Sequence, residues 1–323
     1  MDFSNLSNPV AWLRLAVLLG AGAVVYFGAL SLFTLRRLRH PRRRTYAWAV
    51  ARNVPGDPSE IAPGPIAYES WSFSNDGLVF PVWDARGDDA DGPVVVLSHG
   101  WGASRINMLS RAVAMRPHAS RLLLWDMRGH GEAAGGCTLG AREPRDLLAL
   151  IERAMDGRSG RPFVLYGYSL GAEVTLRTIP MLPASTRGSL GGVALEAPYA
   201  RGITPARAML EEMGFPRVVN LPVAMALHAL LERRSPADRW RDLVPLAAPL
   251  RDAGTRTLVL HGGDDRISPI DDARRIADAS GGTLVEIPGA GHSDLFGDDG
   301  QVRPALADGI ARFFASLRRD ERA

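Results

Sequence analysis

Apolar runs of strand type alternate with segments of helical periodicity from residue 94 to the end of the chain. The run Val94–Ser98 has the continuous apolar character of a buried strand, whereas Glu143–Met155 repeats leucine and isoleucine at helical spacing. The other expected strands are residues 121–125, 163–167, 193–196, 257–261 and 283–287, and the other expected helices are 170–179, 270–279 and 303–317. This alternation predicts a mostly parallel sheet with helices on both faces.

The segment before this region has the pattern of a hairpin. Residues 68–74 and 78–84 alternate between apolar and polar side chains around Asn75-Asp76-Gly77. A turn of this composition between two alternating runs is a strong hairpin signal. It predicts antiparallel strands at one edge of the sheet.

One long stretch inside the alternating region lacks strand character. Between Ala197 and about Pro249 no strand-like run appears, and residues 206–213 and 218–233 have helical patterns rich in leucine and methionine. A helical insertion after a strand, at about residues 198–249, is in the position of a cap over a site. Ordinary packing helices would show the same pattern.

The N-terminal region contains a long segment without charge. A helix from Leu15 to Leu35 would be about 31 Å long, which is enough to cross the hydrocarbon core of a bilayer. A cleaved signal peptide is the alternative, but it requires basic residues before the apolar run, and only Arg14 precedes this one. We therefore expect a retained transmembrane helix.

A dense arginine cluster follows this segment directly. Its members are Arg36, Arg37, Arg39, Arg42, Arg43 and Arg44. Because positive flanks stay in the cytoplasm, we expect a single-pass membrane protein with the N-terminus outside and the globular part cytoplasmic. The cluster also suits anionic lipid head groups. No nucleic-acid-binding motif accompanies it, and no nucleic-acid partner is expected.

These patterns divide the chain into four parts. Residues 1–14 form a short N-terminal segment, 15–35 the transmembrane helix, 36–65 a basic flank and linker, and 66–319 the globular domain with its cap insertion. Proline and glycine recur in residues 46–65, which indicates a loop-like linker.

The expected strand 163–167 runs into Gly167-Tyr168-Ser169-Leu170-Gly171, and a helical run follows. A serine at a sharp strand-to-helix turn has strained backbone geometry, and side chains two residues before and after it would clash. Gly-x-Ser-x-Gly in this context is typical of a nucleophile elbow, which presents Ser169 and aims the Leu170 N–H at the site. Alone, the motif also occurs by chance.

A serine hydroxyl needs a base beside it, and that base needs an orienting carboxylate. Among seven histidines, His292 follows a glycine-rich loop after the last expected strand. Asp264 and Asp265 follow the strand before it, and either is within reach of a histidine in the next loop. The pair is also consistent with a solvated turn, or with helix N-capping near Ser268-Pro269.

Composition narrows the chemistry. The chain has 323 residues, a formal net charge of +3 and no lysine, so all 38 basic residues are arginine. A P-loop lysine, a Schiff-base lysine and a Ser-Lys dyad are therefore excluded. Cys137 is the only cysteine, which excludes an intrachain disulfide and a cysteine-rich zinc site. Serine chemistry of this kind needs no cofactor or metal, and none is expected.

Five motifs in this order resemble the α/β-hydrolase superfamily. They are His99-Gly100-Trp101-Gly102, Asp126-Met127-Arg128-Gly129-His130-Gly131, the elbow, Gly262-Gly263-Asp264-Asp265-Arg266-Ile267-Ser268-Pro269, and Gly291-His292. The order Ser…Asp…His is also that of the family. The resemblance covers about residues 68–317 and implies the α/β-hydrolase fold, here with a short helical cap. The N-terminal span and Glu196-Ala197-Pro198-Tyr199 are similar to membrane-anchored, serine-aminopeptidase-like members.

The resemblance also implies a catalytic triad. Ser169 matches the nucleophile and His292 the general base. The family pattern is Gly-x-x-Asp-x-x-Val/Ile-Pro, and counting from Gly262 places the acid at Asp265. This sequence departs from the pattern at one residue, because Ser268 precedes Pro269, so Asp264 stays an alternative.

The same resemblance implies the remaining roles. The backbone N–H groups of Trp101 and Leu170 match the oxyanion-hole donors. His130 lies in a loop that matches a structural loop of the family, so no catalytic role is expected for it.

Together these residues predict a serine hydrolase that cleaves an acyl ester or a related carbonyl bond through an acyl-enzyme intermediate. Esterases, lipases and thioesterases have this activity, and the leucine-rich cap and the anchor favour a small-molecule or lipid-like acyl substrate. An aminopeptidase or amidase on the same triad is one alternative, with Glu211, Glu212 and Glu232 available to bind an amine. A non-catalytic membrane-anchored scaffold is the other.

Overall fold

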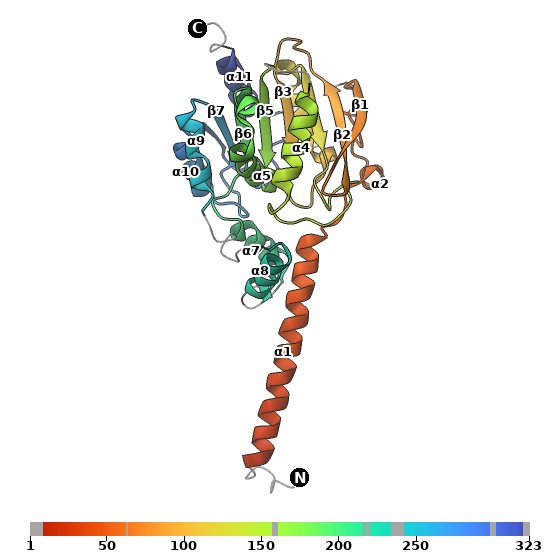
Figure 1. Ribbon diagram of the computed structural model, residues 1–323, viewed down its shortest axis with the longest axis vertical. Helices are drawn as coiled ribbons and strands as arrows, with labels where there is room; N and C mark the ends of the chain where they lie inside the picture. Colours follow the sequence, from red (N-terminus) through yellow and green to blue (C-terminus); the bar gives the residue numbers. More distant parts are fainter. Residues whose placement is uncertain are drawn as a thin grey trace.

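A long helix projects from a globular body (Figure 1). The computed structural model describes residues 9–62, 64–156, 161–215, 218, 220–233, 242–297 and 302–318. The projecting helix is α1 (Pro9–Arg39), and α7 (Ile203–Glu212) and α8 (Asn220–Leu231) lie beside its upper end in Figure 1. Helix α1, these two helices and the body therefore meet at one place.

The body is built on an eight-stranded sheet in the order β1-β2-β4-β3-β5-β6-β7-β8. The strands are β1 (Tyr68–Asn75), β2 (Leu78–Arg86), β3 (Val94–Ser98), β4 (Arg121–Trp125), β5 (Phe163–Tyr168), β6 (Leu190–Glu196), β7 (Arg256–Gly262) and β8 (Thr283–Ile287). β1 pairs antiparallel with β2, and β2 antiparallel with β4, while the other neighbours are parallel. This confirms the mostly parallel sheet with a hairpin at one edge.

Helices cover both faces of the sheet, because alternate strand residues point to opposite sides. In β3, Val94 and Val96 belong to one hydrophobic cluster, and Val95 and Leu97 belong to the other. The first cluster includes residues of α4 (Glu143–Met155), α5 (Leu170–Thr178), α9 (Ala248–Asp252) and α10 (Ile270–Ser280). The second includes residues of α2 (Tyr46–Val50), α3 (Leu109–Met115) and α11 (Pro304–Leu317).

The segment expected as a loop-like linker differs from that expectation. It contains α2, and Ala49 and Ile61 are 0% and 3% exposed in the second cluster. Ala49 and Ile61 are far apart in a segment rich in proline and glycine, so they form no helical or strand period. The sequence pattern therefore did not predict that they pack in the second cluster. The segment is part of the body rather than a free tether.

Helix α1 is a candidate membrane span by its length and apolar composition, although a signal sequence meets the same criteria. It is longer than the uncharged segment, and its buried residues all lie near its C-terminal end: Ser31, Thr34, Leu35 and Leu38. The rest of the helix exposes its apolar side chains, as a lipid-facing helix does.

Candidate active site

The serine elbow has the strained geometry that the motif predicts. Ser169 directly follows β5, with φ 53° and ψ −110°. A Cβ at Gly167 would lie 2.3 Å from the Gly171 carbonyl oxygen, and one at Gly171 would lie 2.2 Å from the Ser98 carbonyl oxygen. Any larger residue at either position would clash with backbone, so both glycines are required for this turn.

The structure brings Ser169, His292 and Asp265 together. His292 Nε2 lies 2.9 Å from Ser169 Oγ, and His292 Nδ1 lies 2.7 Å from Asp265 Oδ2. A carboxylate only accepts hydrogen bonds, so Nδ1 carries the proton and Nε2 is free to accept the serine proton. The arrangement is that of a serine activated by an oriented imidazole.

Asp265 rather than Asp264 faces the imidazole. Its side chain is fully buried, and Oδ1 accepts the N–H groups of Ile267 and Ser268, each at 2.8 Å. Burial is the largest single influence and would raise the pKa of Asp265. The hydrogen bond and charge of His292, the Ser268 N–H and the charge of His261 together lower the pKa below its ordinary value. Asp264 is exposed.

Sequence reasoning missed two residues that support His292. The hydroxyl of Tyr168 donates to the His292 carbonyl at 3.2 Å and lies 2.9 Å from Ser293 Oγ. The Arg111 guanidinium lies 5.0 Å from the centre of the Tyr168 ring and pairs with buried Glu196. Tyr168 lay inside the elbow motif, but nothing in the sequence indicated its partner 124 residues away.

Trp101 and Leu170 line the same cavity as Ser169. Within the described ranges, neither backbone N–H donates to another protein group. The Trp101 indole Nε1 donates to the Leu38 carbonyl at 2.8 Å. Leu38 is in the last turn of α1, where carbonyls have no partner inside the helix. The C-terminal end of α1 therefore fixes the loop that carries Trp101.

Replacing Trp101 by phenylalanine removes this hydrogen bond but keeps the backbone N–H. We expect kcat to fall about five- to tenfold with little change in KM, because one net hydrogen bond contributes about 1 kcal/mol. Steady-state kinetics on a soluble ester measures both constants. Trp71→Phe, which alters an indole in β1 away from this cavity, is the matched control, and equal kcat values in both variants would contradict the prediction.

His130 is buried away from Ser169. Its Nδ1 donates to the Arg128 carbonyl at 3.0 Å, and its ring centre lies 5.0 Å from that of His99. His99 in turn donates to the Gly100 carbonyl at 2.8 Å and accepts the Met127 N–H at 3.0 Å. The His99 imidazole thus supports the Gly100 loop through its hydrogen bond, and the His130 imidazole packs against His99.

Burial lowers the pKa of His130 from 6.5 to about 4. The unfolded chain therefore binds more protons than the folded one between these values, and stability falls as the pH drops through this window. We expect His130 to lower the free energy of unfolding by up to about 3 kcal/mol as the pH falls from 6.5 to about 4. Denaturant titrations across the window should show a shallower pH dependence in His130→Asn; unchanged dependence would contradict the assignment.

A cavity of about 550 Å³ opens beside Ser169, and its volume is within the usual range for ligand sites. Ser169 and His292 lie in its wall, together with Leu38 of α1, Met209 of α7 and Glu212. The body, α1 and α7 each contribute to it. Two residues of α7, Met209 and Glu212, therefore border the cavity that contains Ser169.

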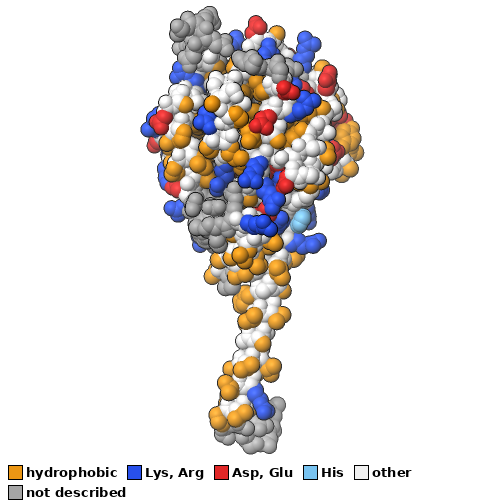
Figure 2. Space-filling view, in the orientation of Figure 1, with side chains coloured by type: hydrophobic (Ala, Val, Ile, Leu, Met, Phe, Trp, Pro, Cys, Tyr) orange, Lys and Arg blue, Asp and Glu red, His pale blue; other side chains and the backbone are white. Residues whose placement is uncertain are grey.

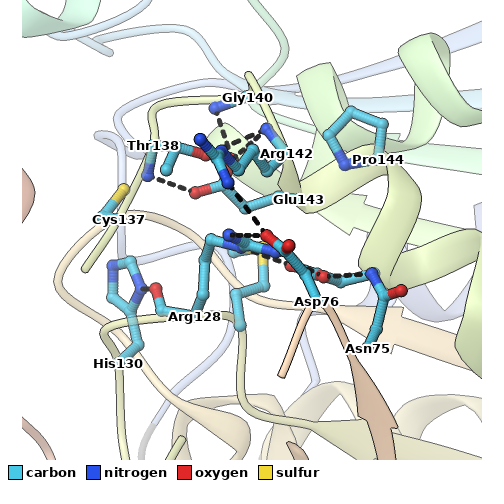
Figure 3. Close-up of polar contacts among 12 residues, drawn as sticks. Asn75, Asp76, Arg128, His130, Cys137, Thr138, Gly140, Arg142, Glu143 and Pro144 are labelled. Carbon is cyan, nitrogen blue, oxygen red and sulfur yellow. Dashed lines mark hydrogen bonds and ion pairs between the residues drawn. The ribbon is translucent and has the colours of Figure 1, made fainter. Parts of the chain in front are cut away.

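A polar network ties the hairpin to the loop before α4 (Figure 3). Arg128 holds Asp146 by two bonds of 2.6 and 2.7 Å, and Asn75 Nδ2 donates to Asp146 at 2.7 Å. Arg142 continues the network from Asp76, at 3.0 Å, to Glu232 of the cap, at 2.6 Å. Glu232 also binds Arg39 at the end of α1, at 2.5 Å.

A doubly covered, mostly parallel sheet with a serine elbow after β5 defines the class of α/β hydrolases. The model of the family described as Alpha/beta hydrolase family matches residues 94–305, more than half of the chain. The chain belongs to this family.

Solved structures agree on the fold. An esterase from Pyrococcus furiosus has a TM-score of 0.62 at 16% identity, covering 87% of this chain and 98% of its own. An esterase from Rhodococcus sp. has a TM-score of 0.55 at 20% identity, with 78% and 99% covered. The ferulic acid complex of Est1E from Butyrivibrio proteoclasticus has a TM-score of 0.58 at 14% identity, with 77% and 99% covered.

Proposed function

We propose that this chain is a serine hydrolase that cleaves an acyl ester through a Ser169-His292-Asp265 triad. The observation that carries the proposal is the pair of distances of 2.9 and 2.7 Å that link the three side chains in series. The strained elbow and the esterase folds of the structural neighbours support it. An intact constellation of this kind also argues against a purely structural scaffold.

The reaction follows from the atoms present. His292 Nε2 takes the proton of Ser169 as its Oγ attacks the acyl carbonyl carbon. Asp265 holds the imidazole in the Nδ1–H tautomer and stabilises it when charged. The Trp101 and Leu170 N–H groups stabilise the oxyanion, while His292 returns the proton to the departing alcohol. Water, deprotonated by His292, then attacks the acyl-enzyme and releases the acid and Ser169.

An aminopeptidase or amidase is the second candidate, because Glu212 and Asp294 line the same cavity and carry the charge needed to bind an amine. Glu232 supports it less, since its carboxylate is held between Arg39 and Arg142. The same triad serves both reactions, so the leaving group decides between them.

We further propose that α1 is retained as a single-pass anchor with the hydrolase body on the cytoplasmic side. Arg36 and Arg42 are exposed at the body end of α1, where the charge rule places the cytoplasm. Protease protection of the body in right-side-out membrane vesicles tests this orientation, and digestion from outside would reverse it.

A substrate panel tests the activity. Full-length protein in detergent is offered matched aryl esters, thioesters and aminoacyl amides of graded acyl length. We expect esters to be hydrolysed fastest, with rates rising with acyl length. A preference for aminoacyl amides, lost in Glu212→Gln, would establish the second candidate instead. Turnover of none of these by folded protein would contradict the proposed function.

A further inference from the structure

Helix α8 is apolar on every side. Its only polar side chains, Asn220 and His228, are both buried. The remaining face exposes Val223, Leu230 and Leu231 by 41%, 71% and 59%. A surface helix in water carries polar residues on its outer face, and α8 has none there. The outer face of α8 therefore suits an apolar environment better than water.

The buried face of α8 packs against the last turns of α1. Asn220 Nδ2 donates to Thr34 Oγ1 at 2.8 Å, so α8 begins at the level of the uncharged segment. Just before α8, the Phe215 ring stacks on Phe33 with centroids 5.5 Å apart. These contacts place one end of α8 at the depth where the apolar part of the anchor ends.

The other end of α8 lies at the arginine cluster. Arg39 contacts His228 Nδ1 at 3.2 Å and pairs with Glu232, the residue after α8. Arginines at the end of a span sit at the level of lipid head groups. Helix α8 thus contacts α1 between Thr34 and Arg39, where the apolar segment meets its charged flank.

The apolar surface is continuous between these elements. Figure 2 shows the hydrophobic side chains of the α1 stem continuing onto the lower end of the body, where the cap lies. With 12 residues, α8 is about 18 Å long, which is too short to cross a bilayer but suits a helix lying in its interface.

We propose that α8 lies in the interface of the leaflet where α1 ends, and that the cavity beside Ser169 takes its acyl ester from that leaflet. This inference rests on the proposed function and on α1 as a membrane anchor. The path is short, because the anchor and the cap both supply cavity wall through Leu38 and Met209. The substrate class is an ester dissolved in the bilayer, such as a glycerolipid, rather than one dissolved in water.

The position of α8 is measurable without catalysis. Cys137, the only cysteine, is buried, so Leu230→Cys in the full-length protein gives a single exposed thiol for an environment-sensitive fluorophore. In phosphatidylcholine vesicles, lipids spin-labelled near the head group should quench this fluorophore. Val79→Cys, at a 54% exposed valine of β2, is the matched control and should show no quenching.

A third label, at Val24→Cys on α1, reports whether the anchor enters the bilayer. Quenching at positions 24 and 230 but not 79 is the expected result. Quenching at 24 alone would overturn the interfacial position of α8. Quenching at none of the three would remove the anchor on which the inference depends and overturn it as well.

A kinetic comparison tests the source of the substrate. The double variant Leu230→Gln/Leu231→Gln should lower hydrolysis of a diacylglycerol in vesicles roughly tenfold, because two apolar contacts with lipid are lost. Its rate on a water-soluble short-chain ester should change less than about twofold, and Val79→Gln should affect neither rate. Equal losses on both esters, or no loss on either, would overturn entry from the leaflet. If the wild type cleaves neither ester, the proposed function fails while the quenching result still reports the position of α8.

Discussion

Replacing Ser169 by alanine should lower kcat on any substrate about a million-fold, to the residual level that oxyanion donors and binding alone provide. The loss is this large because the variant lacks the Oγ that His292 Nε2 contacts at 2.9 Å and that attacks the carbonyl. Wild-type protein should also be labelled by a fluorophosphonate, and Ser169→Ala should not.

The control for this experiment is Ser72→Ala, which removes an exposed hydroxyl from β1. It should retain both labelling and turnover. Labelling that persists in Ser169→Ala would assign the nucleophile to another residue. Folded wild-type protein that neither labels nor turns over would favour the non-catalytic scaffold.

Replacing Asp265 by asparagine should lower kcat about 10⁴-fold with a nearly unchanged fold. The amide oxygen can still accept the Ile267 and Ser268 N–H groups, so the amide NH₂ is turned toward His292. That donor favours the imidazole tautomer with the proton on Nε2, which cannot accept the proton of the serine. Steady-state kinetics and a thermal melt of the same sample separate the chemical loss from instability.

Asp264→Asn is the matched control, because it makes the same change one residue earlier on an exposed side chain. It should change kcat less than about threefold. A larger loss in Asp264→Asn than in Asp265→Asn would transfer the role of the acid to Asp264, the alternative that the sequence left open.

The sheet and the elbow were predictable because their signals are local. Buried strands need continuous apolar runs, and the turn at Ser169 needs glycine two residues before and after, for the steric reason that the Gly167 and Gly171 contacts show. The family order of motifs then pointed to Asp265 and His292, which lie close to Ser169 in the structure.

The packing around the site was not predictable, because its contacts join residues far apart in the chain. Trp101 and Leu38 are separated by 63 positions, and Arg39 and Glu232 by 193. A basic cluster next to an apolar span indicates how a protein is oriented at a membrane. The same pattern gives no indication that Arg39 also pairs with Glu232. The ordered segment around Ala49 was missed for the related reason that single apolar residues carry no period.

The carbonyls at the end of α1 also decide where a different N-terminal helix could be joined to this protein. Leu38 accepts the Trp101 indole and Arg39 accepts the Cys137 N–H at 2.8 Å, so the last turn of the helix is completed by the body. A chimera that joins a foreign helix within residues 36–65 would replace two things at once. It would lose Leu38 from the cavity wall, and it would lose the helix end that holds the Trp101 loop. The natural seam for grafting lies earlier, before Ser31, which is the first residue of α1 to be buried.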